Sequence, residues 1–184
     1  KFTRTFSPSS IELLNLRAKI QAEGCRHCHK RAVVGHGFLL GYAADGNGTA
    51  ARGLRFLFQP LLKGGCGRTF SIHWDSVIPS CSLRAIHLLE LIKAVAAGAT
   101  THSIWKRSRL PISLTGAYRW IRRWRLGTAR MRSLLCLLQP PPGQQAGTST
   151  DFLTLQHLTR AFPATPDARC PIAAFQCHFQ APIL

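Results

Sequence analysis

The stretch GGCGRTFS, residues 64–71, decides how the first half of this chain is interpreted. A cysteine between two glycines, followed by an arginine and an aromatic residue, is typical of a tight turn that presents a thiolate to a metal ion. Such a turn usually carries a second cysteine three residues earlier, because the two thiolates then point to one ion. Lys63 occupies that earlier position here. The sequence therefore leaves open whether other residues complete the site or the turn has lost its metal.

A second cysteine turn lies upstream of this stretch. Cys25 and Cys28 have C-x-x-C spacing and, with Cys66, supply three of the four ligands that a structural zinc site requires. No cysteine occurs between residues 32 and 65, so the fourth ligand must be of another type. Neutral imidazole is the most suitable replacement, because it binds zinc as readily as thiolate does.

Four histidines lie close enough in the sequence to be considered, namely His27, His29, His36 and His73. His27 lies inside the C-x-x-C turn, whose geometry usually directs that side chain outward, and His29 reaches the metal only if the turn is distorted. His36 and His73 remain, and we expect His36 to be the fourth ligand of one zinc ion.

The alternative is a metal-free module in which apolar side chains fill the volume that a metal would organise, namely Leu57, Phe58 and Leu62. Zinc contributes much of the folding free energy of small modules, so a lost ligand removes most of the reason to keep the others. The remaining cysteines have no paired spacing and are expected to be buried free thiols: Cys81, Cys136, Cys170 and Cys177.

The charge of the chain points to an anionic partner. Lys and Arg number 24 against 7 Asp and Glu, which gives a formal net charge of +17 over 184 residues. Nucleic acid is the commonest partner for such a chain. No apolar run approaches the roughly 20 residues that span a bilayer, so no membrane segment is expected. The odd number of cysteines, with one C-x-x-C pair, favours metal ligands and free thiols in a reducing compartment.

Hydrophobic patterning predicts an α+β fold in four parts. Residues 1–24 are expected to form an N-terminal helix. Residues 25–80 contain short apolar runs separated by glycine-rich turns, which indicates a small β module. The helical period begins near Ser82, so residues 81–138 are expected to form a three-helix unit. Residues 139–184 read as a proline-rich linker and a C-terminal helical extension.

The three-helix unit has the order of a DNA-binding helix-turn-helix. A first helix ends near Gly98, a short second helix follows, and Ser113 is placed to cap a longer third helix. One face of that helix is apolar, through Leu114, Ala117, Ile121 and Trp124. No acidic residue occurs between Glu90 and Asp151, whereas a solvated helix face usually mixes both charges.

The early residues of a helix in the major groove contact base edges, and flanking cations contact phosphates. The candidate base readers are Thr115, Gly116, Tyr118 and Arg119. The candidate phosphate contacts are Lys106, Arg107, Arg109, Arg122, Arg123 and Arg125.

Three segments carry a resemblance to a known family: GHGF at residues 35–38, RGLRF at 52–56 and CGRTFS at 66–71. Together with the C-x-x-C pair they resemble the N-terminal zinc ribbon of bacterial transposase-type proteins. SLTGAYRWIRRW, residues 113–124, resembles the helix-turn-helix that follows that ribbon. The resemblance spans about residues 25–140 and implies recognition of double-stranded DNA in the bacterial cytoplasm, at the nucleoid, beside a catalytic nuclease domain.

A nuclease core of that kind needs three carboxylates that bind two metals, and the seven acids of this chain are not embedded in suitable strand patterns. We therefore expect a non-catalytic DNA-binding accessory factor or regulator of a mobile element, with a transposase, recombinase or polymerase as a protein partner. The alternative is an RNA-binding or protein-assembly module, in which the ribbon and the segment AAFQCHFQ, residues 173–180, dock a partner enzyme.

Overall fold

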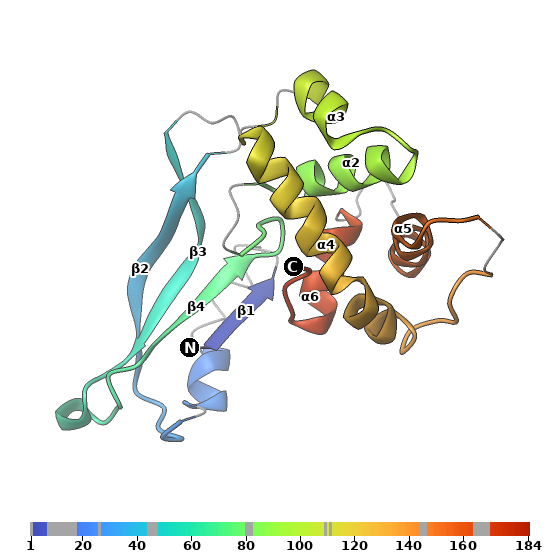
Figure 1. The fold of residues 1–184 in the computed structure, drawn as a ribbon. Coiled ribbons are helices and arrows are strands. Elements are labelled where there is room, and N and C mark those ends of the chain that lie inside the picture. Colours follow the sequence, from blue (N-terminus) through green and yellow to red (C-terminus); the bar gives the residue numbers. More distant parts are fainter. Residues whose placement is uncertain are drawn as a thin grey trace.

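The computed structural model describes residues 2–6, 18–25, 27–43, 48–79, 83–108, 110, 112–143, 147–163 and 170–184. Strands gather on one side of the molecule and helices on the other, as Figure 1 shows. The predicted α+β class is therefore confirmed.

The sheet has four strands in the order β1-β4-β3-β2. Their bounds are β1 Phe2–Phe6, β2 Val33–Tyr42, β3 Thr49–Phe58 and β4 Thr69–Trp74, and a single 3-10 turn, η1, covers Leu61–Lys63. Strands β2, β3 and β4 are antiparallel neighbours, whereas β1 runs parallel to β4 with Phe2 opposite Phe70. The two long antiparallel strands confirm the apolar runs that were predicted to form strands.

The N-terminal segment differs from the expected lone helix. Residues 18–23 are helical, but most of the predicted helix lies outside the described residues. Residues 2–6 form an edge strand of the sheet instead of a lead-in to the helix. Their alternation of aromatic and polar residues, FTRTF, has the period of a strand and was too short to be recognised.

The buried side of the sheet is built from alternate residues of β3. Phe56 and Phe58 are buried, while Leu57 between them is only partly so, because successive side chains of a strand point to opposite faces. The ring of Phe56 stacks on Phe70 with centroids 5.2 Å apart. Ile20 and Cys25 join this cluster, which closes the core of the β module.

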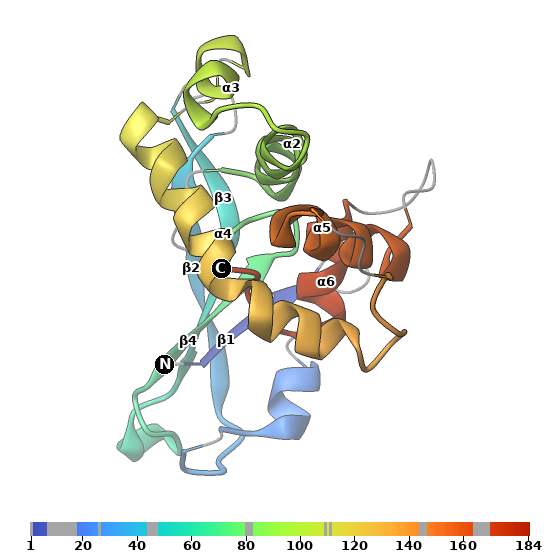
Figure 2. The same ribbon diagram turned by 45° about the vertical axis from the view of Figure 1, so that its right-hand side comes forward.

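Five labelled helices form the second part of the molecule, as Figure 2 shows from a second side. They are α2 Ala85–Ala96, α3 Thr101–Ser108, α4 Leu114–Leu135, α5 Thr150–Ala161 and α6 Pro171–Phe179. Their common core includes Leu88, Trp124, Leu158, Ile172 and Phe175, all almost fully buried. The C-terminal helical extension is thus part of the helical core, because α5 and α6 supply part of the same core as α2 and α4.

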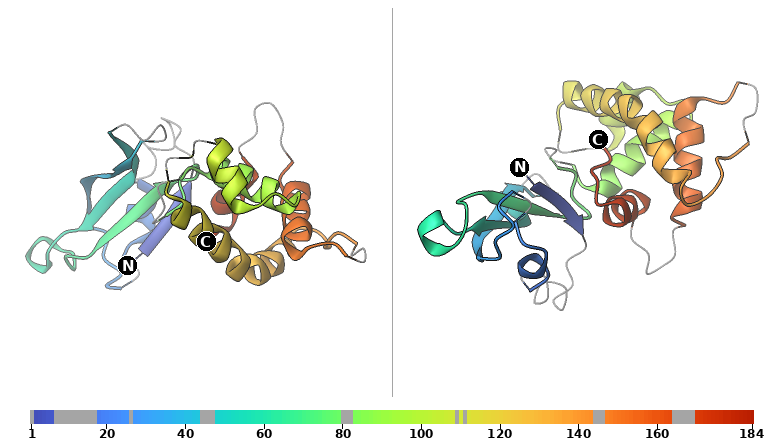
Figure 3. Two further views of the ribbon diagram at one scale, coloured as in Figure 1. Left: turned by 45° about the horizontal axis from the view of Figure 1, so that its top comes forward. Right: turned by 90° about the horizontal axis from the view of Figure 1, so that it is seen from below.

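A buried glutamine holds the two parts of the molecule together. Gln176 of α6 is fully buried, and its Nε2 donates to the carbonyl oxygens of Asp75 at 2.7 Å and Val77 at 3.1 Å. These carbonyls belong to the segment that leaves β4 for α2. The backbone N–H of Ile183 donates to Oε1 of the same side chain at 3.4 Å. Figure 3 shows α6 between the sheet and the other helices, where this contact is made.

Candidate metal centre and basic helical face

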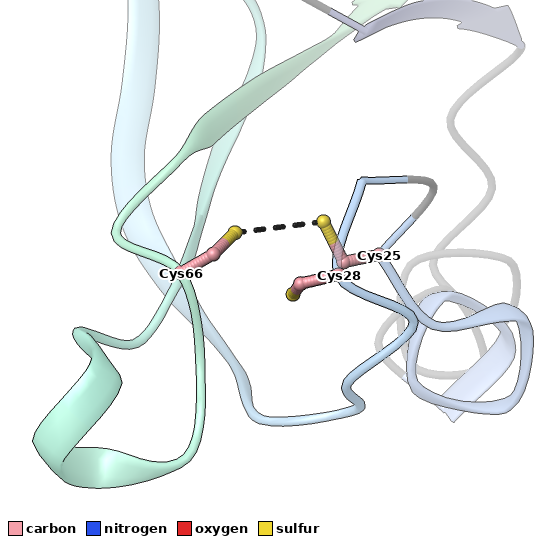
Figure 4. A group of neighbouring side chains, drawn as sticks. All are labelled: Cys25, Cys28 and Cys66. Atoms are coloured by element: carbon pink, nitrogen blue, oxygen red, sulfur yellow. Dashed lines mark hydrogen bonds between the residues drawn. The ribbon is translucent and has the colours of Figure 1, made fainter.

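Three cysteines from two turns meet at one end of the sheet (Figure 4). Cys25 and Cys28 lie between the helical residues 18–23 and β2, and Cys66 lies between η1 and β4. The sulfurs of Cys25 and Cys66 are 3.6 Å apart, and all three sulfurs lie within 4.8 Å of one another. Zinc–sulfur bonds of about 2.3 Å in a tetrahedron separate the sulfurs by about 3.8 Å. The three thiols, which form no disulfide, therefore have the spacing that a metal ion requires.

Backbone hydrogen bonds shape the first turn. The N–H of His29 donates to the carbonyl oxygen of Cys25 at 2.7 Å, and the N–H of Cys25 donates to the carbonyl oxygen of Lys30 at 2.9 Å. His29 has a φ of 57°, in the left-handed region, which closes the turn directly after Cys28. The N–H of His27 points to the sulfur of Cys25 at 3.4 Å. The chain thus presents both thiols of the C-x-x-C pair to one point.

The second turn closes between Gly67 and Gln59, so it spans more residues than a C-x-x-C turn. The N–H of Gly67 donates to the carbonyl oxygen of Gln59 at 3.0 Å, and Gly67 has a φ of 69°. Gly65 passes so close to Gln59 that an added Cβ would lie 1.8 Å from its carbonyl oxygen. Lys63, at the position where a paired cysteine was sought, is exposed in η1. Lys63 is therefore part of a surface loop that this turn encloses.

The surroundings shift the acidity of two of the thiols in opposite directions. Burial raises the pKa of the Cys25 thiol, but hydrogen bonds from the amides of Cys28 and His27 and from the thiols of Cys66 and Cys28 outweigh burial and leave the pKa below its usual value. Burial raises the pKa of the Cys66 thiol, and its neighbours Cys28 and Cys25 raise it further.

The structure does not place His36, the predicted fourth ligand, in the group formed by the three cysteines. His36 is exposed in β2, and within the described part of the chain the group of ligand atoms contains cysteines alone. The strand carries His36 along the sheet, away from the turn that ends before Val33. His73, the other candidate, lies in β4 opposite Gly53 and is also not part of the group.

The apolar side chains of the metal-free alternative have different environments. Phe58 is buried, Leu57 is partly buried, and Leu62 is fully exposed on η1, so only Phe58 fills space inside the module. The expectation that the remaining cysteines are buried also fails at Cys136, which is exposed because it follows the last turn of α4. Cys170 and Cys177 are partly buried, and Cys81 lies outside the described residues.

Three helices follow residue 82 in the order predicted, namely α2, α3 and α4. Gly98 has a φ of 91° at the end of α2, and the hydroxyl of Ser113 accepts the N–H of Gly116 at 3.1 Å to cap α4. Ala117, Ile121 and Trp124 are buried along one face of α4, as expected. Trp120, on the same face, is also buried, although the predicted face did not include it.

Most of the predicted DNA contacts lie exposed on α3 and the first half of α4. The exposed residues are Lys106, Arg107, Thr115, Tyr118, Arg119, Arg122 and Arg123, and Gly116 is partly buried. The guanidinium of Arg123 lies 5.0 Å from the ring centre of Trp120, so a cation–π contact orients it. Arg109 lies outside the described residues.

Arg125 does not extend this basic face. Its Nε donates to Oδ2 of Asp151 at 2.8 Å, and Oδ1 of the same carboxylate accepts the indole N–H of Trp124 at 3.1 Å. Asp151 is remote in sequence, and α5 brings it back against α4. Arg125, a predicted phosphate contact, is therefore held in an ion pair between two helices in the structure.

The metal centre and the basic face lie at opposite ends of the molecule. In Figures 1 and 2, η1 is at the lower end, and α3 with the start of α4 is at the upper end. A ligand at one site is therefore separated from the other by the length of the sheet.

No protein-family model, curated protein or solved structure matches this chain. Across the parts of the chain that the structure describes, none of the helices has the length and apolarity needed to cross a bilayer. Function is therefore argued from the two sites themselves.

Proposed function

We propose that this protein is a non-catalytic DNA-binding protein that contacts double-stranded DNA through α3 and the first half of α4. The observation that carries the proposal is the run of exposed cations on these helices, with no acidic residue between Glu90 and Asp151. The acid that does approach α4 pairs with Arg125, at the edge of the run. Five other cations remain exposed: Lys106, Arg107, Arg119, Arg122 and Arg123.

The geometry of α4 supports a role as recognition helix. It has 22 residues and is therefore roughly 33 Å long. Its second half packs with α5, where Met131 and Leu135 are buried. Its first half begins beside α3 and exposes Thr115, Tyr118 and Arg119 near the helix N-terminus. In a helix-turn-helix, the early residues of the second helix enter the major groove.

Each exposed residue then has a distinct role. Arg119 donates two hydrogen bonds to a guanine edge, while Thr115 and Tyr118 make adaptable contacts beside it. Arg122 and Arg123 lie one turn further along and contact phosphates. Lys106 and Arg107, in the last turn of α3, contact the backbone of the same duplex.

One zinc ion bound by Cys25, Cys28 and Cys66 has a structural role in the same proposal. Three thiolates form a soft ligand set that suits zinc. The ion would join the first turn to the second and fix the end of the sheet. Because this end is remote from α3, zinc holds the β module and does not orient the recognition helix.

The resemblance to transposase recognition domains supports a role as accessory factor or regulator of a mobile element, beside a transposase, recombinase or polymerase. The competing function is an RNA-binding or protein-assembly module. The test below distinguishes the two functions, because only the DNA-binding protein is expected to bind duplexes with a preference for certain bases.

The test is selection of preferred sites from a random duplex library, followed by binding measurements with Arg119→Ala. The variant is expected to lose about 1 to 3 kcal/mol of discrimination at one base pair. Arg130→Ala is the matched control, since it removes the same exposed charge from the far half of α4. Failure to select any duplex site, with tighter binding to single-stranded RNA, would favour the competing function.

A further inference from the structure

The two cysteine turns can be compared through their hydrogen bonds. In the first turn, the residue after Cys28 donates its N–H to the carbonyl oxygen of Cys25. The second residue after Cys28, Lys30, accepts the N–H of Cys25. Cys25 is therefore the backbone partner of both residues that follow Cys28. This pairing holds the thiols of Cys25 and Cys28 near each other.

The two residues after Cys66 make backbone hydrogen bonds of the same kind, but their partners are not cysteines. The residue after Cys66 donates its N–H to the carbonyl oxygen of Gln59, and the second residue after it, Arg68, accepts the N–H of Phe58 at 2.9 Å. Phe58 and Gln59 therefore make, in the second turn, the backbone hydrogen bonds that Cys25 makes in the first. Lys63 makes neither bond, and its own N–H donates to Pro60 inside the loop.

The direction of the side chains indicates which of Phe58 and Gln59 corresponds to Cys25. Phe58 is 6% exposed and belongs to the same buried cluster as Cys25, against which Cys28 and Cys66 pack. Gln59 follows it in the chain and is partly exposed. Neighbouring residues of an extended chain point to opposite faces, so Phe58 is the one that faces the core beside the cysteines.

We propose that Phe58 stands at the chain position from which the fourth protein ligand would come, and that, among the described residues, three thiolates alone bind a soft divalent cation. This inference rests on the metal binding proposed above and is independent of DNA binding. It accounts for the composition of the ligand group, which in the described residues contains three cysteines and no histidine ring nitrogen. An aromatic side chain stands where the missing ligand would be.

The ligand set has two chemical consequences. Three thiolates with a divalent cation carry one net negative charge, which the exposed side chains of Lys30, Arg31 and Arg68 flank in the sequence. A tetrahedral ion keeps one position for a ligand from solution, and the partial exposure of Cys28 and Cys66 leaves solvent access to it.

The test uses Co²⁺ as the probe, because the absorption of cobalt–thiolate bonds reports both affinity and the number of sulfurs. The wild-type protein is compared with Phe58→Cys, Gln59→Cys and Lys63→Cys. Removing even an outer-shell partner weakens metal binding by about 10- to 100-fold, so an added inner ligand is expected to tighten it by at least about tenfold. Phe58→Cys should show this gain with a four-sulfur spectrum, and the other two variants should not.

Addition of imidazole gives a second readout that does not depend on the stability of Phe58→Cys. It should change the cobalt spectrum of the wild-type protein and of Lys63→Cys, since both keep an open position, and leave that of Phe58→Cys unchanged. Tightening in Lys63→Cys or Gln59→Cys, or a wild-type spectrum that is insensitive to imidazole, would overturn the inference. A wild-type protein and variants that all fail to bind Co²⁺ would overturn the metal proposal itself.

Discussion

Asp151 accepts two hydrogen bonds whose loss should have very different effects. The indole N–H of Trp124 reaches Oδ1 from a side chain that is 1% exposed, whereas Nε of Arg125 reaches Oδ2 from a side chain that is 58% exposed. Leaving a buried donor without an acceptor costs about 1 to 3 kcal/mol. An exposed ion pair contributes only about 0 to 1 kcal/mol.

Asp151→Ala removes both acceptors and should lower the free energy of unfolding by about 1 to 4 kcal/mol. In a chain of 184 residues, 1 kcal/mol corresponds to about 2 to 4 °C in Tm. The expected loss in a thermal unfolding scan is therefore roughly 2 to 16 °C. Arg125→Ala removes only the exposed pair and should cost no more than about 4 °C.

Asp151→Asn is the matched control, because its amide oxygen still accepts the indole N–H while the charge that holds Arg125 is gone. It should be more stable than Asp151→Ala, and it should bind DNA with a salt dependence steeper by up to about 0.9 if the released Arg125 reaches a phosphate. Equal destabilisation by Asp151→Ala and Arg125→Ala would refute the assignment of the larger contribution to Trp124.

Three further predictions concern the fold and the thiols. Gln176→Ala removes the donor shared by the two parts of the molecule and should cost about 1 to 3 kcal/mol in denaturant unfolding; a neutral result would show that water replaces it. Gly65→Ala should destabilise the β module more than Gly67→Ala, because only the first places a Cβ against backbone, at 1.8 Å from an oxygen; the reverse order in thermal unfolding would contradict the close approach. Mild oxidation of metal-free protein should join Cys25 to Cys66, whose sulfurs are 3.6 Å apart, and bound zinc should prevent it; peptide mapping that finds another pair would count against the geometry.

Periodicity was sufficient to predict the elements that carry strong local patterns. Short apolar runs predicted strands β2 and β3, a turn residue predicted the end of α2 at Gly98, and a capping hydroxyl predicted the start of α4 at Ser113. The grouping of Cys25, Cys28 and Cys66 also followed from spacing. Each of these depends on neighbours within a few residues or on one repeated spacing.

The features that were missed depend on contacts between remote segments. Strand β1 is defined by its partner β4. The C-terminal extension was predicted to be helical, but not to share a core with α2, as α5 and α6 do. The pairing of Arg125 with Asp151 joins residues 26 positions apart, so a count of charges along the sequence could not predict it. The position equivalent to Cys25 in the second turn was sought at Lys63 for the same reason, since only the backbone bonds show that the turn closes at Phe58 and Gln59.

The central claim, that α3 and the start of α4 bind the phosphates of duplex DNA, is tested most directly by the salt dependence of binding. Fluorescence anisotropy with a labelled duplex should give a slope of log affinity against log salt of roughly −3 to −5, if three to five of the exposed cations each neutralise a phosphate at about −0.9 per contact. The double variant Arg122→Ala/Arg123→Ala should make the slope shallower by about 2, while Arg130→Ala leaves it unchanged. A slope near zero, or the same loss of slope in Arg130→Ala as in the double variant, would contradict the claim.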